Sequence, residues 1–244
     1  MTFKNKISTA KWIQILIFYL LALVLTYTFT KFPNLIRELW ISVFDLNVSF
    51  SWNHGIGLLI ATIACYLLFK QDYKTSFLGN KHLKSLIIAT SYLIIYSLFG
   101  LSNKFNINEH FWALIFCSSM LIYDIFEEIA WRGFLNDKLG KTPTLVKGII
   151  TGILWGLWHI LIFKSFNQFG GLHYFVLLTI IVSIIMSYAV KKTNSILVAA
   201  SIHGLLILRN NYVTIICIVI WTLLIITWER DKIFNRRKTA YNNG

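Results

Sequence analysis

Long apolar segments separated by short polar stretches recur along this chain. An apolar run of about 17 to 25 residues is long enough for a helix that crosses the hydrocarbon core of a bilayer. Eight runs reach or approach that length, and the seventh is the shortest: residues 12–29, 54–69, 83–101, 111–135, 145–163, 172–190, 195–208 and 212–228. The sequence therefore predicts an all-α fold, a polytopic transmembrane helix bundle of about eight spans.

Composition supports a membrane protein with one domain. Of the 244 residues, 57% are hydrophobic and only 14% are charged, and the mean hydropathy is +0.65. Ordinary soluble domains carry about 25% charged residues, so this balance excludes that class. No long hydrophilic segment remains for a second domain. We therefore expect residues 1–244 to form a single membrane domain, with a basic tail over residues 229–244.

The distribution of Lys and Arg predicts the orientation of the bundle. Most of the 23 Lys and Arg residues fall in the N-terminal segment, in alternate loops and in the C-terminal tail. Cytoplasmic loops carry such an excess, so both termini are expected to face the cytoplasm. The net charge of +13 then favours contact with anionic membrane lipids. The charges are spread over loop ends without a nucleic-acid-binding motif, which argues against nucleic-acid binding.

One predicted span contains a cluster of ionisable residues. Asp124, Glu127, Glu128 and Arg132 lie within the otherwise apolar residues 111–135. At the centre of a membrane helix each charged residue costs about 2.5 to 3.5 kcal/mol, so such a cluster indicates a functional site. Glu128 and Arg132 are spaced i to i+4, which predicts an internal ion pair that orients and tunes Glu127. Asp124, one turn earlier, is expected to share the same hydrogen-bond network.

Two of the six histidines lie inside predicted spans. The other four lie at expected helix ends or in loops, and we expect them to be solvated or at the level of the lipid headgroups: His54, His82, His110 and His173. His159 and His203 lie deeper. Glu127, His159 and His203 each stand about three helical turns, roughly 16 to 18 Å, from a lysine that marks the cytoplasmic end of the same helix. An acid and two imidazoles are therefore predicted at one level near the middle of the membrane.

A track of small residues precedes His159. Gly148, Gly152 and Gly156 recur at every fourth position, a pattern that allows close approach of another helix. We expect the track to press the helix of His159 against a neighbour such as the helix of Glu127. Trp155, one turn before His159, is expected mainly to fill space, although its indole N–H can donate a hydrogen bond.

Together these motifs resemble the family of CAAX proteases and bacteriocin-processing enzymes, also called the Abi family, which are intramembrane endopeptidases. Glu127-Glu128-x-x-x-Arg132 resembles the first motif of the family, Trp155-x-x-x-His159 resembles the second, and His203 resembles the histidine of the third. The family-like core is expected over residues 84–228. The resemblance also favours a multi-pass protein of a bacterial plasma membrane.

The resemblance implies that Glu127, His159 and His203 are the catalytic residues, with Glu128 and Arg132 in support. Glu127 and His159 would activate a water molecule, and His203 would stabilise the oxyanion. The family normally has an asparagine four residues after this histidine, and Ile207 stands there instead. Loss of one such donor typically slows a reaction by about 100- to 1000-fold. An alternative on the same residues is hydrolysis assisted by a divalent metal, possible zinc ligands being Glu127, His159 and His203.

Three functions are compatible with these residues. The first is an endopeptidase that cleaves a membrane-associated or prenylated peptide or protein; prenylation is implied only by the resemblance. The second is a noncatalytic relative that binds a peptide or a membrane protein, for instance in self-immunity against a bacteriocin. The third is ion or proton translocation, which also uses intramembrane Glu and His. The sequence lacks the inverted repeats of transporters, which disfavours the third.

Overall fold

The computed structural model of the chain describes residues 2–207 and 210–229, with side chains described for 10–206 and 210–229. It contains ten α-helices within that part of the chain: α1 (Thr2–Phe29), α2 (Leu35–Phe44), α3 (Asn53–Leu68), α4 (His82–Phe99), α5 (Glu109–Glu128), α6 (Asn136–Leu139), α7 (Thr144–Trp158), α8 (Leu172–Thr193), α9 (Ile196–Ile207) and α10 (Asn211–Ile226). Apart from an isolated bridge between Ser76 and Ser195, the described residues form no β-structure. The predicted all-α class is confirmed.

Each of the eight predicted apolar runs contains a helix. Four helical segments are long and apolar enough to cross a membrane: Ala10–Phe29, His82–Phe99, Thr144–Leu161 and Leu172–Thr193. The segments Asn53–Leu68, Ile196–Leu206 and Asn211–Ile226 are apolar but shorter. Many large apolar side chains on these helices are exposed, such as Leu67 at 74% and Ile215 at 60%. This outer surface suits a lipid environment, whereas the number of eight spans stays a prediction. Most of the predicted basic tail lies outside the described residues.

Helix α2 is an element that the apolar runs do not predict. It has only ten residues, too few to span a bilayer, and it buries Ile36 and Trp40, which are one turn apart on one face. The side chain of Asn34 accepts a hydrogen bond from the backbone N–H of Arg37 and so caps its first turn. Because the apolar face is short and interrupted, a search for long apolar runs passes over it.

The predicted span over residues 111–135 is not one continuous α-helix. Helix α5 ends at Glu128, and the chain continues as a π-helix, η1 (Ile129–Leu135), before α6. π-Helical turns are rare and are frequently found at functional sites. Similarly, α7 ends at Trp158, and His159 begins a 3₁₀ turn, η2 (His159–Leu161). The regular helix geometry therefore changes directly after Glu128 and directly before His159.

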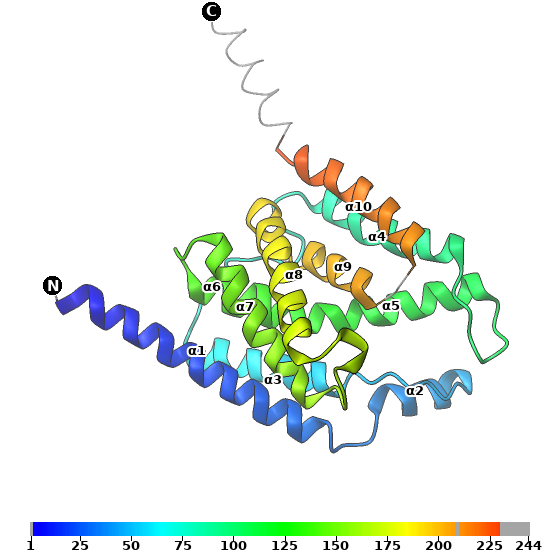
Figure 1. Ribbon diagram of the computed structural model, residues 1–244, viewed down its shortest axis with the longest axis horizontal. Helices are drawn as coiled ribbons and strands as arrows, with labels where there is room; N and C mark the ends of the chain where they lie inside the picture. Colours follow the sequence, from blue (N-terminus) through cyan, green and yellow to red (C-terminus); the bar gives the residue numbers. More distant parts are fainter. Residues whose placement is uncertain (1, 208–209, 230–244) are drawn as a thin grey trace, which may run out of the picture.

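The packing of the helices brings these two points together. Helix α1 packs against α3, while α5 contacts α3, α4 and α9, and α7 lies along α8 (Figure 1). The glycine track lies at the last of these contacts: a Cβ added to Gly148 or Gly152 would lie 2.6 Å from the Cα of Ile184 or 2.5 Å from the Cα of Ile180. The predicted close approach is confirmed, but the partner is α8. The helix of Glu127, named as an example of the partner, does not pack on the track, because the backbone of α8 occupies that face.

Candidate active site

Glu127, in the last turn of α5, is held by two aromatic donors. Its side chain is buried, with 1% exposure. The hydroxyl of Tyr123, one turn earlier on α5, donates a hydrogen bond to Oε1, and Nε1 of Trp155 on α7 donates to Oε2 over 2.8 Å. Hydrogen bonds to an ionised acceptor are roughly twice as strong as neutral ones. The two donors therefore fix the orientation of this carboxylate.

Glu128 faces a different set of partners. Its Oε1 accepts a hydrogen bond from Arg132 Nη1 over 3.1 Å, and it lies 3.0 Å from His203 Nδ1. Glu128 and Arg132 are almost completely buried, with side-chain exposures of 0% and 1%. The ion pair predicted from their spacing is confirmed. Successive positions on a helix point about 100° apart, so the two adjacent glutamates reach different neighbours.

Asp124 contributes a third buried carboxylate. Its Oδ1 lies 3.7 Å from His203 Nδ1, within ion-pair distance but beyond hydrogen-bonding distance. Neither of its oxygens has a hydrogen-bond partner among the described residues. Asp124 therefore interacts with His203 electrostatically and not through a hydrogen bond.

Trp155 does more than fill space. Besides its bond to Glu127, its ring lies under the guanidinium of Arg132, 4.8 Å from centroid to Cζ, and its centroid is 4.8 Å from that of His203. The backbone O of Trp155 lies 2.7 Å from Nδ1 of His159. One residue therefore contacts both predicted catalytic histidines as well as the predicted catalytic acid.

These contacts assign the protonated nitrogen of each histidine. A carbonyl oxygen only accepts hydrogen bonds, so Nδ1 of His159 donates to Trp155 and its Nε2 is left without a proton in the neutral ring. Nδ1 of His203 points at a carboxylate and likewise donates, to Glu128. Nε2 of each ring is then available for a substrate or a water molecule.

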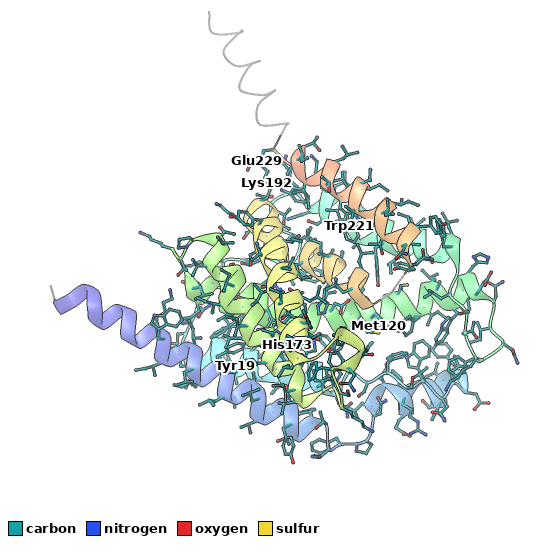
Figure 2. All side chains as sticks on the ribbon, viewed as in Figure 1. Tyr19, Met120, His173, Lys192, Trp221 and Glu229 are labelled. Atoms are coloured by element: carbon teal, nitrogen blue, oxygen red, sulfur yellow. The ribbon has the colours of Figure 1, made fainter. Side chains whose placement is uncertain are left out.

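A cavity of about 480 Å³ adjoins this arrangement, and Glu127, His159 and His203 all line it. The structure thus brings together the three side chains that the sequence placed at one depth. Much of the remaining wall is apolar and includes Phe163, Phe175 and Met120; Met120 lies on α5 where that helix passes α9 (Figure 2). An apolar cavity with a few convergent polar groups is the usual form of a ligand or active site.

His54 was expected to be solvated, but it belongs to the site. His54, in the first turn of α3, lines the same cavity, and its ring centroid lies 5.0 Å from that of Tyr123. Close helix approach makes this possible, because a Cβ on Gly55 would lie 2.7 Å from the ring of Tyr123. The side chain of Asn53 fixes the start of α3 by donating to the carbonyl of Pro33 over 2.8 Å. The adjacent glycine is the available sequence signal, but it does not identify the approaching helix.

Tyr123 was also missed, although helical spacing could have found it. It stands four residues before Glu127, so the two side chains share one face of α5. An aromatic residue in an apolar span is usually a packing residue, and its hydroxyl gains a role only from the neighbouring acid.

The possible metal ligands are not gathered into a metal site in this arrangement. Among residues 2–207 and 210–229 no group of three or more His, Cys, Asp and Glu side chains is placed to hold one ion. Both oxygens of Glu127 already accept hydrogen bonds from Tyr123 and Trp155. Binding of a metal by Glu127, His159 and His203 would therefore require these side chains to move.

Ile207, which stands where the family normally has an asparagine, is the last residue of α9. The side chain of Ile207 is outside the described residues. Asn210, the next asparagine along the chain, accepts a hydrogen bond from the backbone N–H of Val213 over 3.2 Å and caps α10. The side chain of Asn210 is therefore engaged at the start of α10.

Comparison with known proteins agrees with the motifs. Residues 108–208 match a family model described as type II CAAX prenyl endopeptidase, Rce1-like. A CAAX prenyl protease 2 from Methanococcus maripaludis is 33% identical over 130 residues, which are 49% of this chain and 47% of that protein. The chain thus spans about half the length of the curated relative it matches. No solved structure matches the chain. The matched segment contains all three motifs, and over these residues the chain is similar to the CAAX protease family.

Proposed function

We propose that this protein is an intramembrane endopeptidase that hydrolyses a peptide bond in a membrane-associated or prenylated peptide or protein. The observation that carries the proposal is the shared cavity of Glu127, His159 and His203, in which Glu127 is oriented by two donors. We further propose about eight spans in a plasma membrane, with both termini in the cytoplasm. Match to a CAAX protease family supports a peptide substrate.

In this mechanism Glu127 is the general base. It takes a proton from a water molecule that also donates to the unprotonated Nε2 of His159, and the resulting hydroxide attacks the scissile carbonyl carbon. His203, flanked by Glu128 and Asp124, is stabilised as the imidazolium and donates Nε2–H to the oxyanion. When the tetrahedral intermediate collapses, the C–N bond breaks and the proton held by Glu127 passes to the leaving amine. Arg132 holds Glu128 in place.

The test compares wild type with Glu127→Gln, which keeps the shape of the side chain but removes its basicity. Both proteins are purified in detergent and assayed with quenched peptides, with and without a farnesyl group. We expect cleavage to fall by at least about 100-fold, within the range typical for loss of a general base. Glu38→Gln is the matched control, because Glu38 is exposed on α2. Equal cleavage by wild type and Glu127→Gln would refute the role of Glu127.

The metal-assisted alternative is tested in the same assay. If Glu127 activates water without a metal, a chelator leaves the rate unchanged. Loss of activity with chelator and its recovery with zinc would instead establish a metal enzyme. In that case the three side chains would have to rearrange around the ion, as described above.

A noncatalytic binding protein is the second candidate, and Ile207 is the observation that favours it. Without an amide donor at this position the oxyanion would lose one hydrogen bond, which would slow catalysis but would not affect binding. If the protein is a noncatalytic immunity protein, its Glu127→Gln variant would retain the biological effect. An endopeptidase would lose that effect together with cleavage of its substrate.

A further inference from the structure

A second cavity lies at the opposite end of α7 from His159. Its volume is about 600 Å³, and it is formed where the α6–α7 linker meets the last turns of α8. Helix α7 runs from Thr144, which lines this cavity, to Trp158, which precedes His159. At 1.5 Å per residue the two ends are about 20 Å apart. The second cavity is therefore separate from the candidate active site.

The charge of this cavity is strongly positive. Lys141, Lys147 and Lys191 all line it, and Asp137 is the one acidic residue in its described wall. That carboxylate is already engaged: its Oδ2 accepts from the backbone N–H groups of Lys74 and Thr75 over 2.8 and 3.0 Å, and its Oδ1 accepts from the Thr75 hydroxyl. Asp137 thus holds the loop after α3, and its single negative charge offsets only one of the three lysines, which leaves the cavity wall with excess positive charge.

Lys147 is held at the cavity by the protein itself. Its Nζ donates to the backbone O of Asn136 over 3.1 Å. This bond uses one of three ammonium donors, so two more are available to a ligand. Pro143 precedes α7 and supplies no side-chain cap, which leaves the first N–H groups of the helix without a side-chain acceptor. Both features favour an anion with several acceptor oxygens.

The side of the cavity that faces outwards is apolar. Leu145 and Tyr188 belong to its wall and are 47% and 50% exposed. Ile185 and Ile181 lie on the same helix as Tyr188, about one and two turns below it, and are 54% and 50% exposed. A ligand whose anionic group enters the basic cavity can lay an acyl chain along this surface. An inorganic anion would leave these side chains uncovered.

We propose that this cavity binds the phosphate group of an anionic phospholipid. Basic pockets between transmembrane helices at the cytoplasmic side bind anionic headgroups in this way. The lysines around the cavity belong to the basic loops that the sequence assigns to the cytoplasmic side. The lipid would tie together the α6–α7 linker and α8, the helix that packs on the glycine track.

The test measures lipid binding and needs no enzymatic activity. The full chain in neutral detergent is titrated with short-chain phosphatidylglycerol, with the matching phosphatidylcholine and with inorganic phosphate, and bound adducts are counted by native mass spectrometry. The variant is Lys141→Gln with Lys191→Gln, which leaves the Lys147 bond intact. Lys70→Gln with Lys104→Gln removes the same charge from exposed sites outside the cavity and is the control.

We expect phosphatidylglycerol to bind in preference to phosphatidylcholine. Since one lysine near an anionic headgroup changes the binding constant about fivefold, the cavity variant should bind about 30-fold more weakly. The control should change it less than threefold. Equal binding by the cavity variant and the control would overturn the proposal, as would equal binding of the two lipids. Binding of inorganic phosphate as tight as that of the anionic lipid would make this a site for free phosphate instead.

Discussion

Removal of Arg132 tests how the buried charges are held together. Its guanidinium is 1% exposed, lies 3.1 Å from Glu128 and stacks on Trp155. Loss of one member of a buried pair leaves an uncompensated charge and typically costs about 3 to 5 kcal/mol. We therefore expect Arg132→Met to lower the free energy of unfolding by about that amount, and Glu128→Gln to have a cost of similar size because it leaves Arg132 unpaired.

The double variant distinguishes this explanation from simple loss of contacts. In Glu128→Gln with Arg132→Met no charge of the pair remains buried, and the amide oxygen of the introduced glutamine can still accept from His203. The main loss is then the stacking on Trp155, about 1 to 2 kcal/mol. The effects should therefore be far from additive, with a coupling free energy of more than about 2 kcal/mol. Reversible unfolding in mixed detergent micelles, followed by circular dichroism, measures all four proteins of the cycle.

A second ion pair provides the control for that cycle. Lys192 and Glu229 approach to 3.9 Å, and their side chains are 41% and 44% exposed (Figure 2). Exposed pairs of this kind contribute less than about 1 kcal/mol. The coupling for Lys192→Met with Glu229→Gln should stay below that value. Additivity within about 0.5 kcal/mol at Glu128 and Arg132 would refute the view that these residues depend on each other as a buried pair.

Three further substitutions, the first with a matched comparison, test the surroundings of the site. Gly152→Ala should lower the free energy of unfolding by about 1 to 3 kcal/mol, because its Cβ would meet the backbone of α8 at 2.5 Å; Gly133→Ala, whose nearest contact is 3.4 Å, should cost less in the same unfolding assay. Trp155→Phe removes the N–H that orients Glu127, and we expect it to lower kcat by about 10-fold or more in the peptide assay, with KM nearly unchanged. His54→Ala should reduce cleavage at unchanged protein abundance; full activity of this variant would exclude His54 from the site.

The helices could be predicted from the sequence because their signal is local. Each apolar run is long enough to specify a helix without knowledge of its neighbours, and all eight correspond to helices. Helix α2 was not predicted because its apolar face is short. The π-helix after Glu128 was not predicted either, since one extra residue in a turn is hard to recognise in a continuous apolar run.

The ionisable residues of the candidate site were predictable, because placing such residues inside a membrane is costly and so indicates a function. Glu127, His159 and His203 are polar residues inside apolar runs, and the cost of burying them made them visible. His54 and Tyr123 lack that signal, since a histidine at a helix end and a tyrosine in a span are ordinary. They become part of the cavity only through the packing of α3 on α5, which no local pattern contains.

The tandem of Glu127 and Glu128 shows why two adjacent acids are useful in such a site. On a helix they point about 100° apart, so both cannot face the same cavity. Glu128 turns to Arg132 and His203, and its charge is offset within the protein. Glu127 faces the cavity with neutral donors from Tyr123 and Trp155, and no cation among the described side chains bonds to it directly. A carboxylate that is oriented but not paired remains able to take a proton, which is what a general base requires. Glu128 therefore forms the ion pair, and Glu127 is the proposed base. If Glu127 were the residue paired with Arg132, the acid at the cavity would already be engaged and would be a poorer base.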